Sequence, residues 1–150
     1  MAQVASLAAE KAAAILSGAL VTTEFAAQQI VTQNTAPDLA EKTAGAQYPA
    51  IYVYCGKVNN LLREKFRTFS GEAQMVAEVR VSQDRLEGLE AQTQSFSEMV
   101  TGALDAKRGD WGDGMFFGGG YEIGYGPVKH GGRNFLQIAK VTFTVEVSIG

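Results

Sequence analysis

One cysteine and one histidine are the side chains of this sequence best suited to nucleophilic chemistry. Cys55 ends an apolar run, residues 48–55, and His130 lies in the stretch KHGG. A thiol activated by an imidazole would support a small hydrolase or transferase. No neighbouring residue in the sequence supports such a pair, and a single histidine cannot complete the usual zinc ligand sets. We therefore expect Cys55 to be a small core residue and His130 a loop residue, with no catalytic residue and no metal site.

A glycine-rich stretch, GMFFGGGYEIGYGPVKHGG at residues 114–132, invites comparison with a phosphate-binding loop. Dinucleotide-binding motifs need a helix directly after the glycines, so that backbone amides and the helix dipole meet the pyrophosphate. Here the glycines lead into Tyr121, Ile123 and Tyr125, an alternating pattern typical of a strand. The stretch is predicted to be a glycine-bent strand or loop with no cofactor. A ligand-binding domain whose pocket is floored by this loop remains the alternative.

Two aspartates, Asp110 and Asp113 in RGDWGDG, could suggest a calcium site. Their spacing does not match the EF-hand loop, and the distal glutamate of that loop is missing. Aspartates next to glycines are also common in turns, where the side chain accepts a hydrogen bond from a nearby backbone amide. We therefore expect turn-forming residues.

Four basic residues form a local cluster in one segment, GKVNNLLREKFRTFSG, together with Phe66 and Phe69. The four cations are Lys57, Arg63, Lys65 and Arg67. Such a cluster can contact a phosphate backbone without reading sequence. It can equally be a solvated loop, or one half of a charge-complementary protein interface. All three interpretations stay open on sequence grounds, and the segment is predicted to face a partner protein or DNA.

Composition sets the class of protein. The chain has 150 residues, a formal net charge of −3 and a pI near 5.2. A dedicated nucleic-acid-binding domain would normally be basic, and no apolar run is long enough to cross a bilayer. Glu10 and Lys11 interrupt the apolar N-terminal stretch, so secretion is not expected. One cysteine cannot form an internal disulfide, which fits a reducing compartment.

The elements that would position these residues begin with a helical N-terminal region and connection, residues 1–47. Residues 2–17 are rich in alanine and predict a helix that ends at Gly18 and packs on a neighbour. Its weak apolar stripe contains Val4, Leu7, Ala8, Lys11, Ala14 and Ile15. Residues 22–31 predict a second helix, and residues 32–47 a polar surface connection.

The core, residues 48–150, is predicted to be a sheet packed by a long amphipathic helix. Residues 48–55 indicate a strand buried on both faces, and residues 72–83 a strand with one covered and one wet face, as in antiparallel sheets. Asp84 is expected to cap a helix that runs to Arg108 and stops at Gly109. The last strand, from residue 135, either contains a bulge or is buried on both faces at its start.

These patterns predict one α+β domain over residues 1–150, with a mostly antiparallel sheet. The order of its elements resembles that of the tail terminator and neck-ring proteins of tailed bacteriophages. The strand at residues 49–55, the EVRVS strand, the SFSEMVTGAL helix and the VTFTVEVS ending carry the resemblance. The polar connection at residues 32–47 and the glycine-rich stretch do not map onto it.

The resemblance implies a non-enzymatic virion protein of the tail or neck, assembled in the host cytoplasm without membrane contact. It would form a ring, most often a hexamer, that ends polymerisation of the tail tube and joins the tail to head, neck or connector proteins. A head-completion connector or a minor tail protein is the closest alternative. A head-to-tail ring needs exposed apolar surface on each subunit. We expect that interface to contain the aromatic side chains of the glycine-rich region, which are Trp111, Phe116, Phe117, Tyr121 and Tyr125.

Overall fold

The computed structural model describes residues 3–20, 29–35, 48–131 and 134–150. Two helices, α1 (Val4–Leu20) and α3 (Leu89–Asp105), accompany seven strands in this part of the chain. The strands are β1 (Ile30–Val31), β2 (Ala50–Asn59), β3 (Phe69–Gln83), β4 (Gly109–Gly112), β5 (Met115–Tyr125), β6 (Lys129–Gly131) and β7 (Asn134–Ile149). The predicted α+β class is confirmed.

The strands form one curled sheet in the order β1-β2-β3-β7-β5-β4, with β6 continuing the β5 side of β7. All pairs are antiparallel except β1 with β2. The middle of the sheet is the long ladder between β3 and β7, which runs without a register shift from Phe69 opposite Ile149 to Gln83 opposite Phe135. The predicted mostly antiparallel sheet is therefore present, with a parallel edge strand added.

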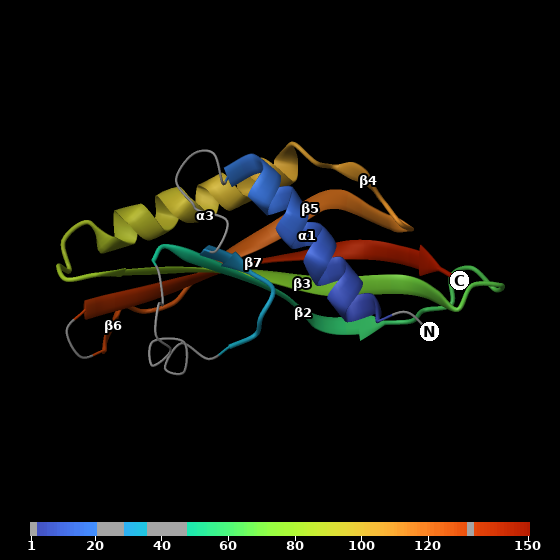
Figure 1. Cartoon of the computed structure of the whole chain (residues 1–150), viewed down its shortest axis with the longest axis horizontal. Coiled ribbons are helices and arrows are strands. Elements are labelled where there is room, and N and C mark those ends of the chain that lie inside the picture. Colours follow the sequence, from blue (N-terminus) through green and yellow to red (C-terminus); the bar gives the residue numbers. More distant parts are fainter. Residues whose placement is uncertain (1–2, 21–28, 36–47, 132–133) are drawn as a thin grey trace.

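Both helices cover the same face of the sheet (Figure 1), which we call the helix face. Alternate residues of the two central strands point to this face and are fully or almost fully buried: Ala73, Met75, Ala77, Val79 and Val81 from β3, and Ala139, Val141, Phe143, Val145 and Val147 from β7. This alternation was predicted from the sequence. The layer of helices differs from the prediction, because two helices of 17 residues each cover the face that one long amphipathic helix was expected to cover.

Helix α1 packs on the core, but the residues that it buries are not the apolar stripe predicted from the sequence. Its buried residues are Val4, Ala8, Ala9, Ala12, Ala13, Leu16 and Leu20. Leu7, which was placed on the packing stripe, is 37% exposed. The helix also continues through Gly18 to Leu20. The buried alanines let the helix backbone approach the sheet closely. Because alanine is only weakly hydrophobic, the pattern of alanines does not show which face of the helix packs on the sheet.

The predicted second helix over residues 22–31 is wrong at its end, because Ile30 and Val31 pair with Ile51 and Tyr52 as strand β1. Residues 22–28, and most of the polar connection at residues 32–47, lie outside the described residues. Tertiary pairing with β2 decides the conformation of Ile30 and Val31, both β-branched residues that fit a sheet better than a helix.

Helix α3 begins at Leu89, four residues later than predicted. Gly88 is its N-cap, in the left-handed conformation with φ 80°, and no side chain caps the helix. Asp84 is therefore not the cap. The amide of Gln83 instead donates to the carbonyls of Arg85 and Glu87, at 2.7 and 2.9 Å, and so orders the turn between β3 and the helix. The helix ends at Asp105, so the predicted stop at Gly109 is also wrong.

The second face of β3 is not uniformly wet, because Glu78 and Arg80 are 5% and 1% exposed. The guanidinium of Arg80 lies 3.8 Å from the ring centroid of Tyr52 and 3.6 Å from a carboxylate oxygen of Glu78. It also donates to the carbonyl of Thr35. The hydroxyl of Tyr54 donates to Glu78 at 2.6 Å, and burial together with this bond raises the pKa of Tyr54. A charged pair is thus buried where the sequence pattern predicts a solvated face.

The first residues of β7 are buried on both faces. Leu136 and Gln137 are 6% and 5% exposed although they point in opposite directions. The β3–β7 register shows no shift there, so the alternative of a bulge is wrong.

Candidate interaction surface

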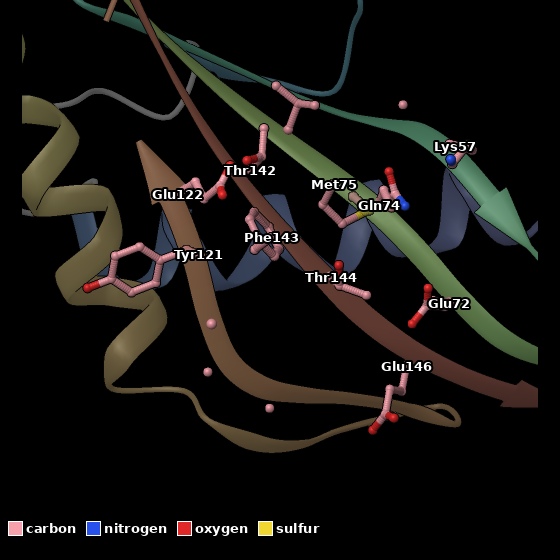
Figure 2. Close-up of a pocket in the computed structure, with 15 residues that line it drawn as sticks. Lys57, Glu72, Gln74, Met75, Tyr121, Glu122, Thr142, Phe143, Thr144 and Glu146 are labelled. Atoms are coloured by element: carbon pink, nitrogen blue, oxygen red, sulfur yellow. The ribbon is translucent and has the colours of Figure 1, made fainter. Parts of the chain in front are cut away.

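The glycine-rich stretch is a bent strand, as predicted, and its bend comes from extra residues. Phe117 pairs with Val145 and Tyr121 with Phe143, so Gly118, Gly119 and Gly120 occupy a gap of one residue on β7. Figure 2 shows β5 curving away from β7 at this point. A methyl group added at Gly118 or Gly120 would meet no atom within 4 Å, so the strand has open space beside it. The glycines shape a surface rather than cradle a phosphate.

Two of the five aromatic residues expected at a subunit interface belong to the core. Phe117 is 0% and Trp111 8% exposed. Their ring centroids lie 5.5 Å apart, and that of Phe117 lies 5.6 Å from Phe143. The indole nitrogen of Trp111 donates to the carbonyl of Lys107 at 2.6 Å, so its polar atom is satisfied inside the protein. The expectation that Trp111 and Phe117 face a partner is therefore wrong, because both fill the space between β5, β7 and the helices.

Two more of these residues are held by helix α3. The hydroxyl of Tyr125 lies 3.0 Å from the buried hydroxyl of Ser97, and that of Tyr121 donates to Asp105 at 3.3 Å. The rings remain partly exposed, at 44% and 37%. They fix the free part of β5 to the helix, which is an internal role. Phe116 points to the other face of the sheet and is 46% exposed. Of the five aromatic residues, it is the one that remains available to contact a partner, as expected.

We predict unequal effects for removing the two tyrosine hydroxyls. Ser97 donates its proton to the carbonyl of Gln94, so Tyr125 is the donor to Ser97. Tyr125→Phe should lower the free energy of unfolding by about 1 kcal/mol, because a partly buried hydrogen bond is lost. Tyr121→Phe should change it by less than about 0.5 kcal/mol, because Asp105 is exposed and keeps Arg108 as a partner. Urea denaturation of both variants measures this, and equal losses would contradict it.

Cys55 and His130 are not a catalytic pair. His130 pairs with Phe135 of β7, whereas Cys55 lies across β3 from Phe143. From residue 135 to residue 143, eight steps of extended strand at about 3.3 Å each separate them by about 26 Å. Burial raises the pKa of the Cys55 thiol, which donates to the carbonyl of Lys57, so the thiol is not activated. The imidazole of His130 packs on Phe135 with centroids 4.9 Å apart.

The other candidate for metal chemistry also has a local explanation. Asp110 accepts a hydrogen bond from the amide of Gly112 at 2.8 Å, and Asp113 forms a 2.7 Å salt bridge with Lys11 of α1. The two aspartates thus order the β4–β5 turn and attach it to a helix. Over residues 3–20, 29–35, 48–131 and 134–150, no three acidic, histidine or cysteine side chains gather as a metal site would require. No helix in these ranges is long and apolar enough to span a bilayer.

The strongest exposed apolar feature lies between β2 and β3, at residues 60–68, which we call the tip. Leu61, Leu62 and Phe66 are 49%, 59% and 96% exposed. Figure 1 shows the tip in green, protruding from the end of the sheet beyond the end of β7. An apolar cluster on a protruding segment is typical of a protein-contact or membrane-contact site. The sequence prediction for this segment rested on its basic and aromatic residues and did not include its two leucines.

The tip is ordered by its own hydrogen bonds. The side-chain oxygen of Asn60 accepts from the amides of Leu62 and Ser70, at 3.3 and 3.1 Å, and its nitrogen donates to the carbonyl of Thr68. The carboxylate of Glu64 accepts from the hydroxyl of Ser148 on β7 at 2.7 Å, which lowers the pKa of Glu64. The apolar side chains are therefore displayed on a rigid support, and little conformational entropy would be lost on binding.

Gly71 is required for the shape of the tip. A Cβ at this position would overlap the carbonyl oxygen of Asn59 and lie 2.8 Å from the amide nitrogen of Leu61. Both are backbone atoms that cannot rotate away, so we predict that Gly71→Ala costs about 1–3 kcal/mol of stability by forcing the strands apart. Gly56→Ala is the matched control in the same hairpin, because its Cβ would make only ordinary contacts. Thermal unfolding measures both, and equal stability of the two variants would contradict the role given to Gly71.

The basic residues of this region are largely paired within the chain. Arg63 bridges Glu72 and Glu146, at 3.4 and 3.0 Å, and these two glutamates face each other across the β3–β7 ladder. Arg67 pairs with Glu64 at 3.1 Å. Lys57 and Lys65 have no ion pair among the described residues. The predicted basic surface facing DNA is thus reduced, since the charge of Arg63 is used to offset the repulsion between two carboxylates.

A groove of about 760 Å³ lies on the sheet next to the base of the tip. It is lined by β3 and β7 residues, including Gln74, Thr142 and Thr144, and by Gly118, Gly119 and Gly120 of β5. Figure 2 shows Glu72 and Glu146 at one end and Glu122 at the other. Val76 adds apolar surface. The groove combines a bed of glycine, threonine and glutamine with an acidic rim, in which Arg63 pairs with Glu72 and Glu146 whereas Glu122 is unpaired in the described part of the chain. Lys57 also lines it, and the groove has no arrangement of catalytic side chains among the described residues.

Comparison with known proteins adds no assignment: no protein-family model matches the chain, and no curated protein sequence is significantly similar to it.

Proposed function

We propose that this chain is a non-enzymatic virion structural protein that forms a ring at the end of a phage tail tube, ends tube polymerisation and joins the tail to the head or neck. The observation that carries the proposal is the rigid apolar tip. Leu61, Leu62 and Phe66 are expensive to expose in a free monomer, and their support is ordered before any partner arrives. A protein that acts by docking needs such a surface.

The arrangement of the remaining side chains supports the same proposal. Cys55 and His130 lie too far apart for an enzyme that uses them, and the glycine-rich stretch is a bulged strand that holds no phosphate-binding helix. The order of elements on which the resemblance rests, namely strand, strand, helix and long final strand, is the order of β2, β3, α3 and β7.

Size and shape of the purified protein test the proposal. We expect light scattering to give a mass several times that of the 16.0 kDa chain, and negative-stain electron microscopy to show annular particles. Added to polymerising tail tube protein of the cognate phage, the chain should shorten the tubes and appear at their ends. A stable monomer at concentrations of about 100 μM, with no effect on tubes, would reject the proposal.

A further inference from the structure

We propose that the tip of one copy docks into the groove of a second copy, with Phe66 over the glycine floor and Lys65 next to the acidic rim. This inference rests on the proposed function, because it gives the contact by which the ring would form. It names two different patches on the same chain, so the contact is heterologous and can repeat around a closed ring.

Charge favours a second copy as the occupant. Three basic residues and one acidic residue give the tip a formal charge of +2, which leaves −5 on the rest of a chain whose total is −3. The tip of one molecule is therefore attracted to the body of another. Within the groove, Glu122 is exposed and its side chain has no hydrogen bond or ion pair among the described residues. The side chain of Lys65 on the tip is also exposed and has no partner among the described residues, so Lys65 of one copy can form an ion pair with Glu122 of another.

The groove has the size and floor that the tip requires. Its volume of about 760 Å³ falls within the 300–1,000 Å³ that is usual for binding sites. Gly118 and Gly120 place no side chain in the space beside β5. An aromatic ring can therefore lie flat on the strand, next to Val76 and the threonines of β7, without displacing any part of the chain. Aromatic side chains in such pockets commonly dominate the binding energy.

The geometry of Arg63 prevents a molecule from filling its own groove. Its guanidinium binds Glu72 and Glu146 at the near end of the groove and so holds the base of the tip there. The tip then extends beyond the end of the sheet (Figure 1), away from Gly118 and Glu122. The occupant of the groove must come from another molecule.

Three variants test the contact. Phe66→Ala and Lys65→Glu alter the tip, and Glu122→Lys alters the groove. We expect each to weaken self-association about tenfold or more in sedimentation experiments, because each removes or reverses a central contact. At concentrations low enough for both proteins to be monomeric, thermal unfolding of Phe66→Ala should match that of the wild type, since the side chain is 96% exposed and supports nothing in the monomer. Combining Lys65→Glu with Glu122→Lys should restore association by restoring the opposite charges.

Leu86→Ala is the matched control, because Leu86 is an exposed leucine outside the tip, at 56% against 59% for Leu62. It should associate as the wild type does, whereas Leu62→Ala should not. Mixing Phe66→Ala with Glu122→Lys gives a sharper test. One protein then has only an intact groove and the other only an intact tip, so the mixture should form a 1:1 dimer that grows no further.

The outcomes separate the two proposals. If the wild type forms rings and the tip and groove variants form them equally well, tip docking is wrong and the ring proposal stands. If the wild type is a stable monomer, the ring proposal fails, and tip docking fails with it. If wild-type protein sediments with phosphatidylserine-containing vesicles, Phe66→Ala does not, and rings are unaffected by the substitution, then the tip binds a membrane surface and the docking proposal is overturned.

Discussion

Phe117→Ala is expected to lower the free energy of unfolding by about 3–5 kcal/mol, a large part of the stability of a domain of this size. The ring is fully buried and contacts both Trp111 and Phe143. Its removal leaves a cavity at the start of the bulge, where Phe117 and Trp111 join β5 and β4 to the core. The loss should be visible as a large fall in the midpoint of thermal or urea unfolding.

The adjacent residue provides the control. Phe116→Ala makes the same chemical change one position earlier, on the opposite face of the strand, where the ring is 46% exposed. It should change stability by less than about 1 kcal/mol. A reversed order, with Phe116→Ala the more damaging, would mean that β5 lies one residue out of the register described here, because a shift by one residue exchanges the faces.

Arg80→Ala is expected to cost about 3–5 kcal/mol of stability, because it leaves the carboxylate of Glu78 buried without its cation. Among the described residues, two guanidinium nitrogens of Arg80, Nε and Nη1, have no hydrogen-bond partner. The pair is therefore an incompletely satisfied one, and replacing both charges should be tolerated much better than removing one. We expect Arg80→Met combined with Glu78→Leu to recover at least half of the loss.

Arg85→Ala is the control for the loss of an arginine, because Arg85 is exposed and has no ion pair among the described residues. It should stay within about 0.5 kcal/mol of the wild type. Chemical denaturation of the two single variants, the double variant and this control completes the comparison. A neutral Arg80→Ala would mean that Glu78 reaches solvent in the folded protein.

Strand alternation made much of the sheet predictable. Ala73 to Val81 and Ala139 to Val147 alternate with polar residues, and a period of two assigns their faces without knowledge of the partners. The helix face of the sheet was therefore predicted correctly. The stripe of α1 was not, because alanines occur on all sides of that helix and hydrophobicity does not distinguish Ala12 from Ala14.

Long-range contacts decided the features that the sequence could not predict. Arg80 is buried because Tyr52 and Thr35 cover it, and neither is near it in the chain. The aromatic side chains of β5 were assigned to one surface, whereas the bulge at Gly118–Gly120 sets which of them reach the core and which reach α3. The exposure of the tip could have been predicted from the sequence. Leu61, Leu62 and Phe66 are large apolar residues between two strands, and their spacing matches neither a strand nor a helix that would bury them.

The central ladder also sets the order of events during synthesis. Because β3 pairs along its whole length with β7, the ribosome must add residues 84–149 before the middle of the sheet can close. At about 5–20 residues per second, this takes roughly 3–13 s. In that interval the apolar face of β3 is covered by α1 and, once it has been made, by α3, but β3 has no β7 beside it. We therefore expect the nascent chain to be a substrate for chaperones.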